Sequence, residues 1–389
     1  MPLVLPTRKR QNQHRGNFRL SKINKDSSPH IFSGEVNEDF RLFDPVARKE
    51  FNKQPMEKKK KSLDAKSFIL YPFELIFNQK KSFEEKEAET LHLIEEHLKH
   101  HKKCFVSTSY GMDSIVLMHL VIKACKNVGC ELPEFFLNDT LNTYKEEPEY
   151  WKLINEKFGI EDKFRKFKPP VDEKGNRYTV WSIAKKYGYL PNFRKTQRDG
   201  NNKVRVLNKG DDGGIPKCCE ILKKKSMKEL LKGLPKDQRY DCHFVGTRAE
   251  ESRMRAMGVL QRCRSYVIKT RFPYQIRAVT PLSFWQKADI YEYYARYDIP
   301  KNPTYTIHNI DRMGCASCPA HRFWEVRLAS DPTEQGQGML KMNLKILKST
   351  QPERYAESIS LLKKRKLVPE LITELENTEQ ITDYFGDKK

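Results

Sequence analysis

The 389-residue chain lacks any apolar run long enough to cross a bilayer. Its longest one, Ile115 to Ile122, is far shorter than the roughly 20 residues that a spanning helix needs, and it contains His119. The first residues, Met1 to Pro6, are followed rather than preceded by basic residues, and no signal cleavage site is visible. We therefore expect a cytoplasmic protein without a membrane partner. Its 9 cysteines should be reduced, metal-bound or catalytic rather than paired in disulfides.

Acidic residues are also scarce: 51 of them face 73 lysines and arginines, which gives a net charge of +22. A charge of this size favours a polyanionic partner such as DNA or RNA. Solubility alone is the alternative explanation, because the basic excess is spread along the chain. A hydrophobic content of 38% fits a folded protein with one large or two ordinary domains.

The two commonest phosphate-binding glycine loops, Walker A and G-x-G-x-x-G, are missing. A different glycine turn, S-x-G-x-D-S from Ser109 to Ser114, links the β-rich run 104–108 to the apolar helix that starts near Ile115. Strand, turn and buried helix begin a parallel α/β sheet, and the N–H groups that open such a helix bind phosphate. Gly111 would let the backbone approach closely, and Asp113 indicates either a metal ion or a capped helix. The alternative is a capped turn in some other α/β sheet.

The rest of the chain predicts further strands and helices. A second β-rich run, 134–140, ends in Asn138 and Asp139, which places both near a ligand at the carboxyl edge of the sheet. Other strands are expected at 164–167, 240–245 and 278–282, and helices at 84–100, 148–158, 180–187, 217–231 and 289–297, with two or three more after residue 332. The basic, glycine-rich segment 190–214 predicts a loop that could act as a lid.

Five motifs, in order, resemble the phosphoadenosine phosphosulfate (PAPS) reductase family of the adenine nucleotide alpha-hydrolase-like superfamily. They are the 109–114 loop, the second-strand motif 136–140, Gly246-x-Arg248-x-x-Glu251-Ser252-x-x-Arg255, the 281–290 helix entry, and 300–305 with Gly314-Cys315. The resemblance covers roughly residues 91–323 and implies a doubly wound parallel sheet of the HUP type. Tyr110 and Met112 depart from it, because many relatives have Gly and Lys there, and this puts full ATP-cleaving activity in doubt.

The resemblance also implies roles for single residues. An adenine nucleotide (ATP, or PAPS or APS) and Mg²⁺ would be bound by Ser109, Gly111, Asp113, Ser114, Asn138, Asp139, Gly246, Arg248, Glu251 and Ser252. Asp113, Arg248 and Arg255 would be catalytic. Guanidinium groups form bidentate pairs with phosphate or sulfate oxygens, although surface ion pairs with Glu250 or Glu251 are the simpler alternative.

The cysteine pattern divides the family further. Cys218-Cys219 followed by Cys315-x-x-Cys318 resembles the ligand pattern of the iron–sulfur members, in which four thiolates hold a [4Fe-4S] cluster. Zinc uses the same ligand type, although adjacent cysteines suit a tetrahedral site poorly, and free thiols are a third alternative. Cys104 and Cys242 fall on predicted strands and are expected to be buried as small hydrophobic residues.

The function expected from these features is ATP-dependent. Reductases of the family carry a nucleophilic cysteine in a carboxyl-terminal tail, and here no cysteine follows Cys318. We therefore expect an ATP pyrophosphatase or adenylating activity in sulfur transfer to nucleic acid, as in the DNA-phosphorothioation branch or the tRNA-thiolating enzymes. The alternatives are a PAPS or APS reductase, and a non-catalytic nucleotide- or DNA-binding regulator. A sulfur-donor or thiol-reductant protein is a possible partner.

Three regions are expected along the chain. A basic extension covers 1–85, with clusters such as Lys58 to Lys61, and is either a solvated arm or a polyanion contact. The nucleotide-binding domain covers 86–330, and a helical region covers 331–389.

Overall fold

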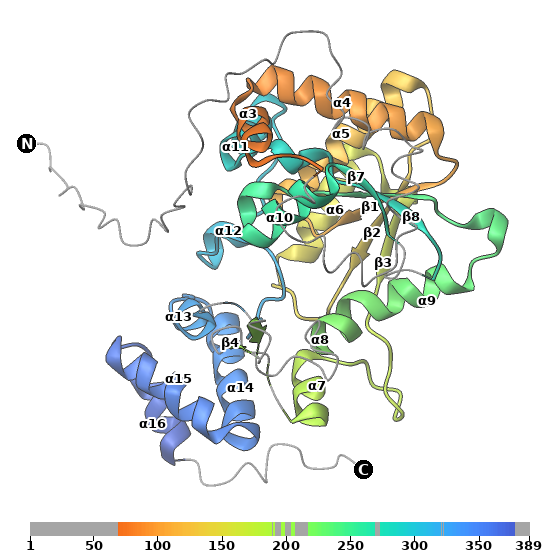
Figure 1. Cartoon of the computed structure of the whole chain (residues 1–389). Coiled ribbons are helices and arrows are strands. Elements are labelled where there is room, and N and C mark those ends of the chain that lie inside the picture. The colour runs from red at the N-terminus through yellow and green to blue at the C-terminus, as the bar shows by residue number, and fades with distance from the viewer. Residues whose placement is uncertain are drawn as a thin grey trace, which may run out of the picture. The chain divides into compact units, whose positions relative to one another are not determined.

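Six strands form one sheet in the order β3-β2-β1-β6-β8-β7 (Figure 1). The strands are β1 Cys104–Thr108, β2 Glu134–Asn138, β3 Phe164–Phe167, β6 Cys242–Val245, β7 Ser265–Ile268 and β8 Ile276–Val279. This computed structural model describes residues 69–377 apart from 189, 191–195, 199–203, 207–216, 269–272, 320 and 322. The basic extension therefore lies almost entirely outside the described residues. No helix in the described ranges is long and apolar enough to span a membrane.

The sheet is parallel except at one edge. Val106 of β1 lies opposite Phe135 of β2 on one side and Phe244 of β6 on the other. Strand β7 pairs antiparallel with β8 and had no counterpart in the sequence-based prediction. The expected doubly wound α/β class is confirmed, and the strand order reverses direction between β1 and β6. Such a switch point opens a crevice at the carboxyl ends of the strands, where ligands bind.

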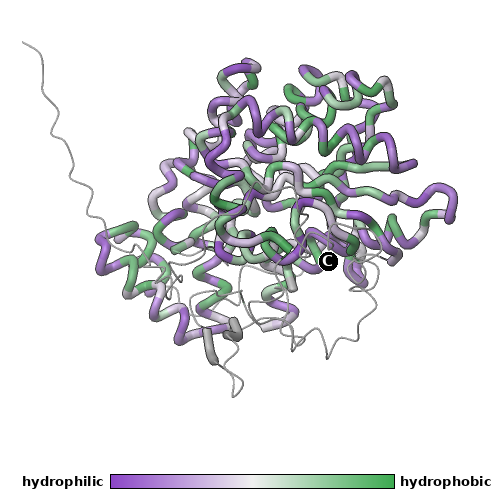
Figure 2. Tube along the Cα trace, turned by 45° about the horizontal axis from the view of Figure 1, so that its top comes forward, coloured by the Kyte–Doolittle hydropathy of each residue, from purple (hydrophilic) through white to green (hydrophobic). Residues whose placement is uncertain are grey.

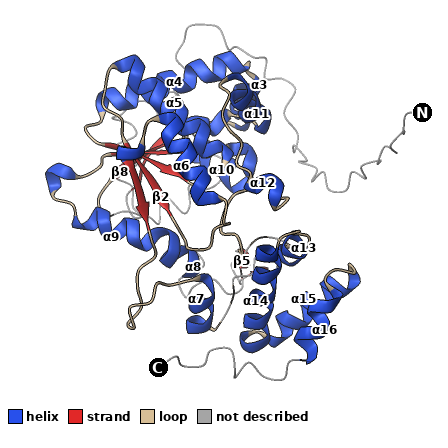
Figure 3. Ribbon diagram, turned by 180° about the vertical axis from the view of Figure 1, so that it is seen from behind, coloured by secondary structure: helices blue, strands red, loops and turns tan. Residues whose placement is uncertain are grey.

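Alternation along the strands builds two hydrophobic layers. In β1, Val106 packs on the face covered by α4 Phe83–His100, α5 Met112–Val128, α6 Glu147–Phe158 and α11 Lys287–Arg296. Phe105 points to the opposite face and packs with Phe136 and with Met227 of α9 Ser226–Gly233. Helices therefore lie on both faces of the sheet (Figure 3). The outer helices alternate hydrophobic and hydrophilic residues along their length (Figure 2).

Helix α4 shows why the amphipathic prediction for 84–100 holds. Ser82 accepts a hydrogen bond from the Glu85 backbone N–H, and the Glu85 carboxylate accepts one from the Ser82 N–H, which forms a capping box. Ile94 and Leu98 of the same helix are buried against the sheet. Helix α5 is buried along most of its length, as its continuous apolar sequence predicts.

A second core lies among helices. It is built from α7 Val180–Tyr187, α8 Lys217–Cys219, α13 Trp324–Ala329, α14 Glu334–Thr350, α15 Pro352–Lys364 and α16 Pro369–Asn377. The last three are the helices expected after residue 332. Shorter helices are α3 Pro72–Lys80, α10 Arg253–Arg262 and α12 Thr304–Ile307. Within the segment predicted as a lid, Leu190 is buried and strands β4 Thr196–Arg198 and β5 Val204–Val206 pair antiparallel, while the other residues of the segment lie outside the described residues.

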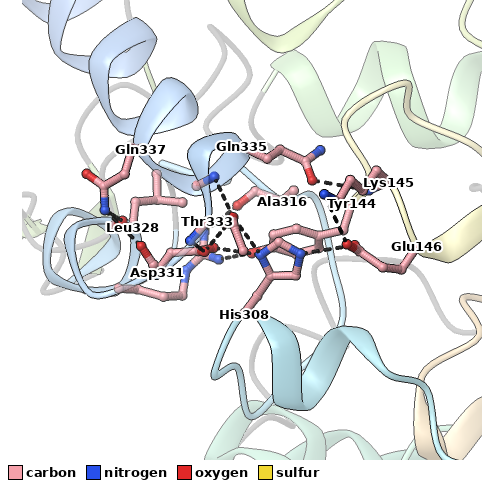
Figure 4. Close-up of polar contacts among 12 residues, drawn as sticks. Tyr144, Lys145, Glu146, His308, Ala316, Leu328, Asp331, Thr333, Gln335 and Gln337 are labelled. Carbon is pink, nitrogen blue, oxygen red and sulfur yellow. Dashed lines mark hydrogen bonds and ion pairs between the residues drawn. The ribbon is translucent and has the colours of Figure 1, made fainter.

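A buried histidine joins the second core to the sheet (Figure 4). His308 has a fully buried side chain; its Nδ1 lies 2.9 Å from Asp331 Oδ2 and its Nε2 lies 3.0 Å from Glu146 Oε2. The backbone N–H of Lys145 donates to Gln335 Oε1 at 3.2 Å. These contacts hold the start of α14 against the loop that follows β2.

Candidate functional site

The S-x-G-x-D-S turn leads from β1 into α5 at the switch point of the sheet. Ser114 Oγ donates to the Gly111 carbonyl at 2.8 Å and accepts from the Ser109 N–H at 3.3 Å, so the turn is closed on itself. The Met112 N–H donates to the Tyr305 hydroxyl at 3.2 Å. A Cβ at Gly111 would come within 3.3 Å of Met313 Cβ, which leaves little room for another residue. The turn therefore contacts the 300–305 motif, although the two bonded residues are 193 positions apart in the sequence.

Tyr110 is one departure from the family pattern, and its surroundings show how a tyrosine is accommodated there. Its φ is +50°, the left-handed region that glycine enters easily and tyrosine rarely. The side chain is fully buried, and its hydroxyl donates to Asn155 Oδ1 at 2.5 Å. Its ring packs 5.9 Å from the rings of Trp151 and Phe164. Packing and a hydrogen bond thus offset a backbone strain of order 1 kcal/mol that a glycine would not have.

The Gly246–Arg255 motif lies directly beside the turn. A Cβ at Gly246 would sit 3.1 Å from the Asp113 carbonyl oxygen, so the two segments touch through their backbones. Arg248 is buried, and its Nε donates to Asp113 Oδ1 at 2.8 Å while its Nη1 donates to Glu250 Oε2 at 2.5 Å. Burial raises the pKa of Asp113, and the charge of Arg248 opposes that rise. Asp113 and Arg248, expected to act together, are therefore direct partners.

Arg255 is paired within its own motif. Its guanidinium forms an ion pair with Glu251, and Ser252 Oγ caps α10 by accepting from the Arg255 N–H at 3.3 Å. Burial, then the charge of Arg312, lowers the pKa of Arg255. The ion pairs with Glu250 and Glu251 that the sequence left open are thus present. A phosphate that binds these arginines would have to share them with the carboxylates of Glu250 and Glu251 or displace those carboxylates.

Two cavities open on the carboxyl edge of the sheet. One, of about 550 Å³, is lined by the turn, Gly246, Glu251 and both arginines. The other, of about 480 Å³, is lined by Asn138, Cys219 and Cys315 among others. Ser109 and Arg255 line both cavities, so the two spaces adjoin one another at these residues.

The two predicted strand-end residues have different positions. Asn138 lines the smaller cavity, and its buried Oδ1 has no hydrogen-bond partner in the structure. Asp139 is buried and turned toward its own loop, where its Oδ1 accepts from the Leu141 N–H at 2.9 Å. Asp139 is not among the residues that line either cavity.

The two cysteine pairs come from two separate segments of the chain that both border the second core. Cys218 and Cys219 open a continuous helix whose next turn, Glu220–Lys225, is π-helical. Cys315 donates from Sγ to Thr140 Oγ1 at 3.5 Å, and the Ala316 N–H donates to the Asn142 carbonyl at 2.7 Å. The loop after β2 therefore holds the C-x-x-C segment at the sheet edge.

Cys219 and Cys315 line the same cavity, so the two cysteine pairs lie near one another. The Cys218 thiol is hydrogen-bonded to Cys219, and its pKa is raised by that bond first, then by burial and by the charges of Cys219, Cys318 and Cys315. The same hydrogen bond, followed by the charge of Lys223, lowers the pKa of Cys219. The structure therefore brings all four predicted cysteines into one region.

Two further residues at this site were missed by the sequence-based prediction. Lys223 stands one helical turn after Cys219, and the negative charge of Cys315 is the first cause that raises its pKa. Glu147 opens α6 and lines the smaller cavity, and burial raises its pKa to about 7. Neither belongs to a recognisable motif, because their proximity to the cysteines arises only in the folded chain.

The strand order and the S-x-G-x-D-S turn define a doubly wound α/β protein with a glycine turn at the switch point of its sheet. Residues 103–321 match the family described as Phosphoadenosine phosphosulfate reductase domain, and the chain belongs to that family. No curated protein matches the sequence.

Several solved structures are similar to this chain at low identity. PAPS reductase from Candida auris, in a phosphate complex, is 14% identical over 63% of this chain and 96% of that one, with a TM-score of 0.40. The Candida glabrata FMN adenylyltransferase with FMN and the ATP analog AMPCPP is 11% identical over 62% and 69%, with a TM-score of 0.38. The U34-tRNA thiolase NcsA from Methanococcus maripaludis, with its [4Fe-4S] cluster, is 13% identical over 78% and 84%, with a TM-score of 0.32.

Proposed function

We propose that the protein is an ATP-dependent adenylating enzyme that releases pyrophosphate in a sulfur-transfer reaction on nucleic acid. The observation that carries this proposal is the 550 Å³ cavity, in which the S-x-G-x-D-S turn faces two arginines. Helix-opening N–H groups, serine hydroxyls and guanidinium groups are the donors that bind phosphate oxygens. In this reading the phosphates of ATP occupy the larger cavity.

The adjoining cavity would hold the adenosine. Asn138 Oδ1 is a buried acceptor without a partner, and such an atom costs about 1–3 kcal/mol until it is satisfied. The adenine amino group or a ribose hydroxyl would supply the missing donor. Because Ser109 and Arg255 line both cavities, one nucleotide can extend from one to the other.

Charge development explains why two arginines would be needed. When an acceptor oxygen attacks the α-phosphorus, the bond to the bridging oxygen breaks and negative charge moves onto pyrophosphate. Arg248 and Arg255 would stabilise that charge more strongly in a cavity than in open water. Mg²⁺ would be held by Asp113 together with the phosphates, and it would neutralise part of the same charge.

We infer that the four cysteines hold an iron–sulfur cluster rather than a single zinc ion. Among the described residues, only one trio of histidine, cysteine or carboxylate side chains has its ligand atoms within 4.8 Å of one another, and these cysteines are not in it. Tetrahedral zinc at 2.3 Å would need sulfurs about 3.8 Å apart. A [4Fe-4S] cluster binds each thiolate to a different iron and so spaces them more widely. Cys218, Cys219, Cys315 and Cys318 would hold the cluster, which would bind or deliver sulfur.

The proposal that nucleic acid is the acceptor rests on the net charge of the chain. A net charge of +22 supports binding of DNA or RNA, because phosphate contacts dominate such affinities. The acceptor atom would be a nucleic-acid phosphate or base that lies at the mouth of the cavities.

The test is ATP–pyrophosphate exchange and AMP release, measured with and without DNA or RNA. We expect activity in the wild type, its loss in Arg255→Gln, and its retention in Arg296→Gln, whose exposed side chain pairs with Glu84 and Glu292 and lines neither cavity. Anaerobic purification with iron, sulfide and zinc analysis tests the cluster separately. Tight ATP binding without AMP under any acceptor would instead indicate a non-catalytic regulator.

One observation favours a second candidate, a PAPS or APS reductase. Cys219 lines the same cavity as Ser109, and its lowered pKa makes it a stronger candidate nucleophile than a buried neutral thiol. That candidate predicts sulfite release from PAPS or APS with thioredoxin or glutathione as reductant. It also predicts that Cys219→Ser abolishes sulfite release, while ATP alone gives no AMP.

A further inference from the structure

A second cluster of metal-binding side chains lies at the opposite edge of the sheet. His97, in the last turn of α4, and His101, which caps that helix, are four residues apart and so face the same side. Cys242 is the first residue of β6, at the amino end of the parallel strands. One ligand atom from each of these three residues lies within 4.8 Å of the other two.

We propose that His97, His101 and Cys242 form a binding site for a transition-metal ion, with Zn²⁺ as the best match. Two imidazoles and one thiolate are nitrogen and sulfur ligands, which suit Zn²⁺ and exclude Mg²⁺ and Ca²⁺ as preferred ions. Three protein ligands leave the fourth tetrahedral position to a water molecule. This site is separate from the four-cysteine region, which lies at the carboxyl edge of the sheet.

The surroundings of His101 favour this arrangement. Its Nδ1 lies 3.4 Å from Asp241 Oδ2, which leaves Nε2 as the nitrogen that can bind a metal. Metal-binding histidines commonly donate their second N–H to a carboxylate in this way, which fixes the tautomer. Asp241 is itself held, because the backbone N–H groups of Lys102 and Lys103 both donate to it at 3.1 Å.

The thiol is fixed equally well. Cys242 is fully buried and lies in register with Cys104 on β1 and Arg277 on β8. Cys104 is a neighbouring thiol on the same face of the sheet.

An ion can reach the trio from outside. The side chain of His101 is 16% exposed, and His97 is also half-buried, whereas the thiol behind them is closed off. The two imidazole rings lie 5.4 Å apart between centroids and 24° from parallel.

The experiment uses the full chain with Cys315→Ser and Cys318→Ser, which removes half of the other thiol ligands. The chelator-treated protein is titrated with Co²⁺ without oxygen, and Zn²⁺ is then added as competitor. We expect one Co²⁺ per chain, a cobalt–thiolate charge-transfer band, the strong visible bands of tetrahedral Co²⁺, and their loss when Zn²⁺ displaces it. Mg²⁺ should not compete.

Variants separate the proposed ligands from their neighbours. Cys242→Ser should abolish the charge-transfer band, and His101→Gln should do the same without touching the buried thiol, in case the first variant unfolds. Asp241→Asn should weaken Co²⁺ binding about 10- to 100-fold. His100→Ala, at an exposed histidine next to the site, and Cys125→Ser, at a buried thiol elsewhere, are the matched controls and should bind normally.

Two results would overturn the proposal. One is a titration with no thiolate band although circular dichroism shows a folded chain. The other is Co²⁺ binding by folded His101→Gln that equals binding by the parent protein.

Discussion

Replacement of Arg248 by methionine should destabilise the protein strongly, because it leaves a buried carboxylate without its cation. Arg248 is 9% exposed and Asp113 is 22% exposed as side chains, and their atoms are 2.8 Å apart. Removal of one partner from a buried ion pair costs about 3–5 kcal/mol. Since Asp113 keeps some contact with water, we expect the lower end, about 3 kcal/mol, in urea unfolding followed by circular dichroism.

The same variant should also bind ATP poorly if the proposed site is correct. One lost charge-assisted hydrogen bond is worth about 1.5–3 kcal/mol, which corresponds to about 10- to 100-fold in affinity. The double variant Arg248→Met with Asp113→Asn is the control. It should be more stable than Arg248→Met alone, because the unpaired charge is gone, while ATP binding stays weak.

The sign of the pH dependence gives a further check. A carboxyl whose pKa is raised by folding contributes stability at low pH that is lost as pH rises through the folded pKa. Without Arg248 the pKa of Asp113 should rise further, so the deficit of Arg248→Met should grow as pH rises above the ordinary pKa of an aspartate carboxyl. A single variant that loses less than about 1 kcal/mol, or a double variant no more stable than it, would refute the reasoning.

Three other substitutions have expected outcomes in the same unfolding assay. Tyr110→Phe should cost about 1–2 kcal/mol, because it leaves the buried Asn155 Oδ1 without its donor. Glu147→Gln should make the free energy of unfolding less dependent on pH. The pKa of Glu147 is raised to about 7, so the wild type loses stability as the pH rises toward that value. An unchanged pH profile in the variant would contradict this. Gly336→Ala should cost about 2 kcal/mol or more, since its Cβ would lie 2.1 Å from Asp331 Cγ; a near-neutral effect would show that the contact relaxes freely.

The sequence was sufficient for the features that depend on local patterns. The run from Cys104 to Ile122 gives a strand, a closed turn and a buried helix, because a short β-rich run and all-round hydrophobicity are readable in one segment. Cys104 and Cys242 are buried as expected. The order of the motifs was enough to identify the family, which the match over residues 103–321 confirms.

Features that depend on distant contacts could not be read in the same way. Strand β7 is antiparallel because it pairs with β8, the next strand along the chain, in the opposite direction. Lys223 reaches the cysteines through a helix that includes a π-helical turn, which residue propensities do not predict. The proximity of His97 and His101 to Cys242 joins residues more than 140 positions apart, so no spacing rule could identify it.

The most direct test of the account is equilibrium binding of ATP to the wild type and to the double variant Ser109→Ala, Ser114→Ala. The Ser114 hydroxyl closes the turn at the switch point, the Ser109 hydroxyl lies 3.4 Å from it, and Ser109 lines both cavities. The account predicts that wild-type protein binds ATP and that the folded double variant binds it at least about 10-fold more weakly. Equal affinity in the two proteins, or no ATP binding by the wild type, would contradict the proposed nucleotide site.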